Sequence, residues 1–493
     1  MITKELLARY EPTIGIECHV QLKTRTKLFS GADNDAREAE PNTTVSPICF
    51  GLPGTLPVLN REAVTMAIRA GIALQAEVAP VSSFDRKHYF YPDLPKGYQI
   101  TQLERPTIGQ GKVDVPFGDG SFTVRITRAH IEEDAGKLTH PEGADYSLVD
   151  LNRAGTPLIE IVSEADMHSA AQAKAYVQEL YLLMKYADVT EGNLYYGNMR
   201  FDVNISVAQK GATKWGTRVE VKNLNSFRSV ERAVEYETAR QIELIEKGQP
   251  VAQETRGWND AAQKTTAQRS KENAHDYRYF PDPDIPPVEI DPAQVAAIRE
   301  AISDTLPWTL RTKLEEAGIR QEVAENLLLA DAELNVGYVR TVLAIHATHG
   351  AEPATFAAHF LVNRDMKVRR DAGDGEQGAV PSAVQFADVH ALLKSNKLSS
   401  NNADTLLFAL QAEPDATAQS LAEQHHLLQE SDAGVLDAII ADVLADPASQ
   451  KAVTDVKAGE QKAIGFLVGQ VMKRSGGKVN PALVNQALRR HLS

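Results

Sequence analysis

The stretch Ile14-Gly15-Ile16-Glu17-Cys18-His19-Val20 decides the fold class expected for the first half of the chain. Its four apolar side chains occupy alternate positions, and Glu17 and His19 occupy positions on the opposite face. Alternation with a period of two residues predicts a β-strand that buries one face.

Two further stretches alternate in the same way. In residues 201–207 the polar positions are Asp202, Asn204 and Ser206, and in residues 219–222 Glu220 and Lys222 oppose two valines. This pattern is typical of an antiparallel sheet with one face on a core and the other open. The open face is either an ordinary solvent face or a binding site. The second interpretation is possible because acids, an imidazole and an ammonium group can bind metals and phosphates.

Helical periodicity follows the strand signals. Apolar residues at helical spacing predict helices over 170–187 and 230–246, which would pack on the sheet to give an α+β domain. A proline-rich run at 280–287 indicates the end of this domain, and Asp291-Pro292 opens a helix with a cap and an early proline. The remainder is rich in Ala, Leu, Glu and Gln, with a surface loop predicted over 367–378.

Composition sets the broad class of the protein. The 493 residues are 43% hydrophobic and 24% charged, which excludes a disordered or collagen-like chain and suggests about three domains. We find no apolar stretch long enough for a membrane span and no signal peptide at the N-terminus. The only cysteines, Cys18 and Cys49, cannot form a disulfide framework, so we expect a cytoplasmic protein.

Charge is distributed unevenly. The net charge of −14 argues against a non-specific nucleic-acid binder. From residue 450 to the end, however, eight basic residues are opposed by only two acidic ones. Such an excess is typical of a segment with a polyanion partner, but charge alone does not distinguish this from a solvated helical surface.

An acidic cluster is the clearest candidate site. The segment 130–137 holds Glu132, Glu133 and Asp134 in succession, flanked by a histidine and a lysine. Like charges this close repel one another unless a cation offsets them, and Mg²⁺ prefers oxygen ligands. The alternative is an acidic surface turn, the more common fate of such a run.

Other motifs are weaker. Residues 211–218 have the glycine spacing of a phosphate-binding loop but lack its Lys-Ser/Thr, so we reject that interpretation. Basic and aromatic residues interleave over 84–98 and 277–284, which suits either nucleotide binding or plain loop packing. Cys49 has no cysteine partners at zinc-site spacing, and we interpret His346 and His349 as structural.

The chain as a whole resembles the GatB family, the B subunits of the aspartyl/glutamyl-tRNA(Asn/Gln) amidotransferases. The resemblance lies in stretches that follow one another in the same order as in that family: 11–24, 84–93, 132–137, 146–153, 221–227 and 463–470. It implies a heterotrimer with an amidase (glutaminase) partner, the A subunit, which releases ammonia from glutamine, and with a small C subunit. The B subunit would phosphorylate the side-chain carboxylate of Glu-tRNA(Gln) or Asp-tRNA(Asn) with ATP, and ammonia would then displace the phosphate.

The resemblance also implies an arrangement of domains. Residues 1–292 would form a catalytic cradle, residues 293–408 a helical domain, and residues 409–493 a helical tail that binds tRNA. The expected tRNA contacts are Lys473, Arg474, Lys478, Arg489 and Arg490. A catalytically silent tRNA-binding adaptor with the same fold is the alternative, and the sequence does not decide which tRNA is the substrate.

Site residues are carried over from the matching motifs. Metal ligands would be Glu17, His19, Glu132 and Glu133; catalytic residues would be Glu17, His19, Glu133, Lys87 and Asp150; and ATP contacts would be Arg86, Lys87, Asn204 and Lys222. Asp202 and Glu220 would line the same sheet face. The implied cofactors are ATP and Mg²⁺. Zinc is not expected, because Ser46 stands where some members carry the first cysteine of a zinc site.

Overall fold

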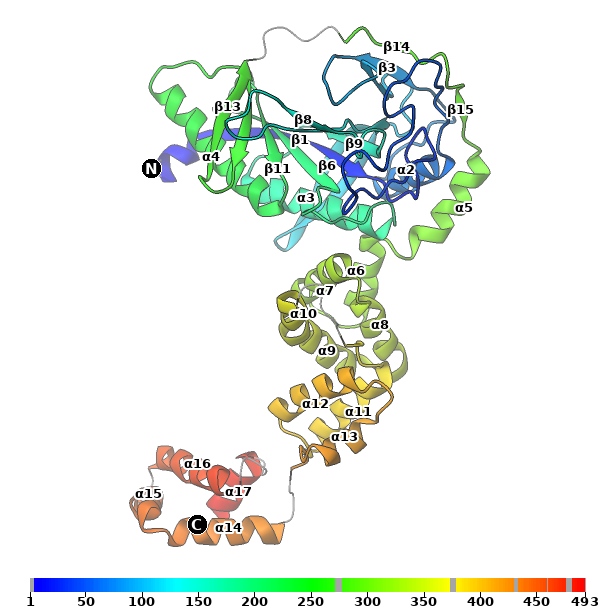
Figure 1. The fold of residues 1–493 in the computed structure, drawn as a ribbon. Helices are drawn as coiled ribbons and strands as arrows, with labels where there is room; N and C mark the ends of the chain where they lie inside the picture. Colours follow the sequence, from blue (N-terminus) through cyan, green and yellow to red (C-terminus); the bar gives the residue numbers. More distant parts are fainter. Residues whose placement is uncertain are drawn as a thin grey trace. The chain divides into compact units, whose positions relative to one another are not determined.

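The computed structural model describes residues 4–270, 277–372, 378–429, 433–458, 460–475 and 481–492 (Figure 1). The chain divides into two compact units, Met1–Thr309 and Leu310–Ser493. Helix α5 (Pro292–Ser303) belongs to the first unit, where it packs against α2 (Arg61–Ala73), and its cap at Asp291 is the one expected. The domain boundaries at 292 and 408 stay predictions. None of the described helices is both long and apolar enough to cross a membrane.

An eight-stranded sheet dominates the first unit, in the order β13-β12-β11-β10-β1-β9-β6-β5. All neighbouring strands are antiparallel except β11 and β12, so the expected antiparallel sheet is in fact mixed. The strands are β1 (Tyr10–Gln21), β5 (Gly111–Phe117), β6 (Gly120–Glu133), β9 (Pro157–Ser163), β10 (Met199–Gln209), β11 (Val219–Leu224), β12 (Glu254–Asn259) and β13 (Lys264–Ser270).

The apolar face of this sheet forms a core with two long helices. Helices α3 (Ala170–Tyr186) and α4 (Phe227–Glu246) pack on this face and bury residues such as Tyr176 and Val234. Both predicted helices are confirmed. Helix α4 begins three residues before the expected start, because the Ser226 hydroxyl caps it by accepting from the Ser229 amide.

Short strands bring the two aromatic and basic stretches together. In a three-stranded sheet, β3 (Asp85–His88) pairs with β4 (Tyr98–Thr101) on one side and β14 (Phe280–Pro281) on the other. Arg86 lies opposite Phe280, although they are far apart in sequence. The remaining elements of this unit are α1 (Lys4–Ala8), β2 (Val81–Ser82), β7 (Lys137–Thr139), β8 (Leu148–Asp150) and β15 (Val288–Glu289).

The second unit is helical. It begins within α6 (Pro307–Glu316) and continues through α7 (Gln321–Leu334), α8 (Tyr338–His349), α9 (Ala351–Phe360), a π-helix η1 (Leu361–Asp365), α10 (Met366–Ala372), α11 (Ala383–Lys394), α12 (Ser400–Ala412) and α13 (Ala418–Gln424). The loop predicted over 367–378 is wrong for residues 367–372, which are helical. The Arg369 side chain is buried there and pairs with Asp365, whereas Lys367, Arg370 and Asp371 of the same charged run are exposed. Residues 373–377 lie outside the described residues.

The last helices share an apolar core of their own. They are α14 (Ala433–Ala445), the 3-10 helix η2 (Pro447–Ser449), α15 (Gln450–Lys457), the 3-10 helix η3 (Gln461–Ala463), α16 (Ile464–Arg474) and α17 (Pro481–Leu492). Ile440, Leu467 and Leu488 are fully buried between them. This core makes the three longest helices of the segment interdependent.

Candidate functional site

Strand register gathers polar side chains on the open face of the large sheet. His19 of β1 lies opposite Glu160 of β9 and Arg200 of β10, and Glu17 lies opposite Asp202. Paired residues of neighbouring strands point to the same face. The polar positions of five strands therefore share one surface: His130, Glu132, Glu160, Glu17, His19, Arg200, Asp202, Asn204, Glu220 and Lys222.

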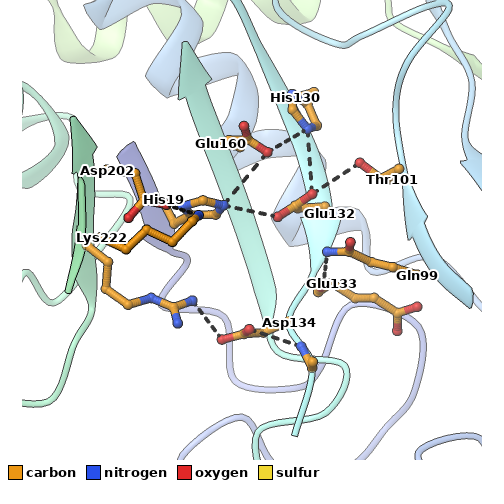
Figure 2. A network of polar contacts seen from close by, with 12 residues as sticks. His19, Gln99, Thr101, His130, Glu132, Glu133, Asp134, Glu160, Asp202 and Lys222 are labelled. Atoms are coloured by element: carbon orange, nitrogen blue, oxygen red, sulfur yellow. Dashed lines mark hydrogen bonds and ion pairs between the residues drawn. The ribbon is translucent and has the colours of Figure 1, made fainter. Parts of the chain in front are cut away.

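The first acid cluster consists of His19, Glu132 and Glu160 (Figure 2). The His19 Nε2 atom lies 3.6 Å from Glu132 Oε1 and 3.7 Å from Glu160 Oε2. One ligand atom of each residue lies within 4.8 Å of the others. An imidazole nitrogen with two carboxylates is a donor set that fits a divalent cation, and the carboxylates would leave room for phosphate oxygens and water.

His130 and Thr101 hold the carboxylates of this cluster. The His130 Nε2 atom is 3.3 Å from Glu160 Oε2 and 3.6 Å from Glu132 Oε2, and the Thr101 hydroxyl donates to Glu132 Oε2 at 3.2 Å. Burial disfavours the imidazolium, yet hydrogen bonds to Glu132 and Glu160 raise the pKa of His130 to about 9. Burial likewise disfavours the Glu160 carboxylate, but the bond from His130 holds the pKa of that carboxyl well below its usual range.

A second acid cluster lies on the same face and consists of Glu17, Asp202 and Glu220. The Asn204 amide donates to Glu17 Oε1 at 2.9 Å, and Lys222 Nζ lies 2.8 Å from Asp202 Oδ2 and 3.1 Å from Glu220 Oε1. Burial, followed by repulsion from Glu160, raises the pKa of Glu17. The expected ATP contacts Asn204 and Lys222 are thus bonded to acids of this cluster.

Glu133 points away from both clusters. Its carboxylate forms an ion pair with Lys96 and accepts from the Ile100 amide at 2.9 Å, as its direction in Figure 2 also shows. Consecutive residues of a strand face opposite sides, so Glu132 and Glu133 separate at the end of β6. Of the expected trio Glu17, His19 and Glu133, the structure brings only the first two to one face.

The side chains of the neighbouring residues Arg86 and Lys87 also have different partners. Arg86 forms ion pairs of 2.7 Å with both Asp282 and Asp284 and stacks over Tyr98, so it fastens the 280–284 segment to β3. Lys87 Nζ lies 5.0 Å from the centre of the Tyr277 ring. Burial disfavours its charge, but Glu132 and other nearby groups raise the pKa of Lys87.

Asp150 has a different setting. Its Oδ1 atom accepts from the amides of Asn42 and Asn152 at 3.1 and 3.0 Å, which fixes a loop. It also lines a pocket of about 660 Å³ that reaches Gln21, two residues beyond His19 on the same face of β1. Asp150 therefore adjoins the polar face without joining either cluster.

The remaining predicted residues are Cys49 and the basic residues of the tail. The Cys49 Sγ atom lies 3.3 Å from Ser46 Oγ and 3.5 Å from Lys27 Nζ. In the tail, Arg474 pairs with Asp446, Arg490 pairs with Asp437 at 2.8 Å, and Arg489 donates to Asn485. Lys473 is exposed on α16, and Lys478 lies outside the described residues.

Sequence reasoning missed Glu160 and Arg200, and it noted His130 only as a neighbour of the acidic run. Glu160 sits between two isoleucines in Pro157–Ser163, so the alternation of that short strand could have revealed it. His130 shares a face with Glu132 by the same rule. Arg200 makes a 3.0 Å ion pair with Asp134 that joins β10 to the end of β6, and no local pattern predicts such a pairing.

Two protein-family models match this chain. A family model described as the GatB/GatE catalytic domain matches residues 12–296, and one described as the GatB domain matches residues 343–492. The first match contains the whole polar sheet face, and the second contains the α14–α17 core. Because the first model covers more than half of the chain, the chain belongs to the GatB/GatE class.

Curated relatives show which family within this class the chain belongs to. Proteins named as the B subunit of aspartyl/glutamyl-tRNA(Asn/Gln) amidotransferase are 42% identical over 490 residues in Synechococcus sp. (strain JA-3-3Ab), 44% over 484 in Methylobacillus flagellatus and 44% over 490 in Azoarcus sp. (strain BH72). Each match covers 98% of this chain and at least 98% of the relative. The chain belongs to the GatB family.

Proposed function

We propose that this chain is the B subunit of a tRNA-dependent amidotransferase and that its sheet face activates the side-chain carboxylate of a misacylated tRNA with ATP. The names of its full-length relatives support the reaction class. The observation that carries the site is the cluster of His19, Glu132 and Glu160, and the charge of Glu132 raises the pKa of Lys87.

The chemistry explains why acids and a lysine are needed together. A carboxylate is a poor acyl donor because its leaving group would be oxide. Attack of a carboxylate oxygen on the γ-phosphorus of ATP releases ADP and gives an acyl phosphate, from which ammonia then displaces inorganic phosphate. A magnesium ion held by His19, Glu132 and Glu160 would offset phosphate charge during the transfer. Lys87 would contact a phosphate oxygen.

Ammonia must come from another chain in this proposal. Glutamine hydrolysis needs an activated nucleophile. Burial raises the pKa of the Cys18 thiol well above its usual value, so it stays protonated. Cys49 is buried beside Ser46 and Lys27, neither of which is a general base of the usual imidazole kind. We therefore propose two partner proteins, an amidase that releases ammonia and a small third chain that completes a heterotrimer.

The tail is the proposed tRNA-binding part. Lys462 of η3 and Phe466 and Lys473 of α16 are spaced so as to share one helical face, and all three are exposed. An exposed aromatic ring between two cations is suited to contact with nucleic acid.

Transamidation by the assembled complex tests the proposal. Purified complex is given ATP, glutamine and either Glu-tRNA(Gln) or Asp-tRNA(Asn), and the amidated product is measured. We expect ATP hydrolysis that depends on misacylated tRNA and that Glu132→Gln abolishes. A matched control is Glu11→Gln, since Glu11 is an exposed residue on the same face of β1 but opposite Ala208. An adaptor would bind tRNA without either activity and would contradict the proposal.

A further inference from the structure

The loop between β10 and β11 carries an unusual set of exposed side chains. Trp215 is 74% exposed, and Lys210, Lys214 and Arg218 surround it in sequence. No acidic residue occurs between Asp202 and Glu220, although the chain carries a net charge of −14. Within the described parts of the chain, no carboxylate is paired with any of these three cations. A large exposed indole among unpaired cations has no role in the core.

The base of this loop is held in place. A Cβ atom at Gly216 would lie 2.1 Å from the Val207 carbonyl oxygen, so the loop backbone packs directly on β10 at that point. The Lys210 amide donates to the Arg9 carbonyl at 2.9 Å, which ties the loop to the start of β1. Trp215 therefore projects from a fixed backbone next to Gly216.

The loop also continues directly into the candidate site. Arg218 precedes β11 by one residue, and Glu220 of β11 belongs to the second acid cluster. At about 3.3 Å per residue, five residues from Trp215 to Glu220 span at most roughly 17 Å. A ligand bound by the loop would thus reach the polar face of the sheet.

We infer that residues 210–218 bind the single-stranded 3′ end of the aminoacyl-tRNA, with Trp215 stacked on one base and the three cations on backbone phosphates. This inference rests on the proposed function. Aromatic stacking with flanking basic residues is the usual way in which proteins hold single strands. A duplex keeps its bases stacked on one another, so its bases offer no free face to Trp215. The 3′ end carries the amino acid, which must lie at the sheet face.

The test compares two tRNAs on the assembled complex. Dissociation constants are measured for intact tRNA and for tRNA that lacks its last four nucleotides. For intact tRNA, Trp215→Ala should weaken binding about tenfold and Trp215→Phe less than about threefold, because phenylalanine still stacks. For the shortened tRNA both variants should match the unaltered complex. Saturating turnover should stay within about twofold, since the loop does not touch the reacting atoms.

Controls separate this inference from the proposed function. Phe117→Ala removes an exposed aromatic from the β5–β6 hairpin, which includes the edge strand β5 of the same sheet, and should change nothing. If Trp215→Ala weakened the binding of both tRNAs equally, or prevented assembly of the complex, the inference would be overturned. Transamidation by the unaltered complex would still support the proposed function. Full affinity for intact tRNA in Trp215→Ala would overturn the inference as well. Failure of the unaltered complex to use any misacylated tRNA would instead refute the proposed function.

Discussion

At the scale of single residues, Glu132 and Glu133 show how strand geometry divides two identical side chains. Glu132 is buried against His19, His130 and Thr101 on the polar face, whereas Glu133 pairs with Lys96 on the other side of the strand end. The sequence motif predicts both as metal ligands. The alternation of β6 explains why only Glu132 lies in a cluster with metal-ligand geometry.

Glu132→Gln should therefore weaken Mg²⁺ binding at the first cluster and lower transamidation by at least about 100-fold, because an amide carries no charge for the cation. Calorimetric titration of the chain with Mg²⁺ measures the first effect, and product formation by the complex measures the second. Glu11→Gln serves as the control for both. Undiminished Mg²⁺ affinity in Glu132→Gln would mean that the cluster is not the metal site.

At the scale of elements, alternation and helical spacing predicted β1, β10, β11, α3 and α4, because those patterns record which face is buried. Pairings between distant segments could not be predicted in this way. The contact of β14 with β3 places Tyr277 beside Lys87, yet these residues are separated by almost two hundred positions. Helix α10 was also missed. A charged residue such as Arg369 is expected at the surface, but its ion pair with Asp365 allows it to be buried.

Asp365 stabilises the helical unit through one buried network. Its carboxylate accepts from Arg369, from the Tyr338 hydroxyl and from Gln411 at 2.7 Å, which ties η1 to α8, α10 and α12. Asp365→Ala should lower the free energy of unfolding by about 3–5 kcal/mol, since it leaves the Arg369 charge buried without its partner. Urea denaturation of the full chain measures this. Asp371→Ala, on the exposed side of α10, should stay within about 0.5 kcal/mol.

At the scale of the whole molecule, the acidic net charge and the basic tail fit the proposed division of labour, in which the sheet is catalytic and the tail binds tRNA. Ile440 of α14 is buried in one core with Leu467 of α16 and Leu488 of α17. A truncation at residue 450 would therefore expose the apolar face of α14. Point substitutions are the better test of the tail.

Lys473→Ala should weaken tRNA binding and reduce the slope of log affinity against log salt by about 1, because one phosphate contact is lost. Filter binding at several salt concentrations measures both quantities. Lys247→Ala is the matched control, since Lys247 is also exposed but lies at the end of α4. A salt slope unchanged by Lys473→Ala would show that this lysine does not contact tRNA.

The isolated chain should show no glutaminase activity, and Cys18→Ala combined with Cys49→Ala should leave ammonia-dependent transamidation by the complex largely intact. The reason is that burial raises the pKa of the Cys18 thiol, and that Cys49 has Ser46 and Lys27 beside it in place of an imidazole base. Release of ammonia from glutamine is the measurement. Hydrolysis by the chain alone that vanished with either cysteine would make this protein its own ammonia source.

The central claim is that the sheet face forms an acyl phosphate on the side-chain carboxylate of the misacylated amino acid. It is tested most directly by labelling both oxygens of that carboxylate with ¹⁸O and analysing the inorganic phosphate released by the complex with ATP and ammonia. The account predicts one ¹⁸O atom in each phosphate released, and loss of this labelled phosphate in Glu132→Gln. Amidated tRNA formed together with unlabelled phosphate would contradict it.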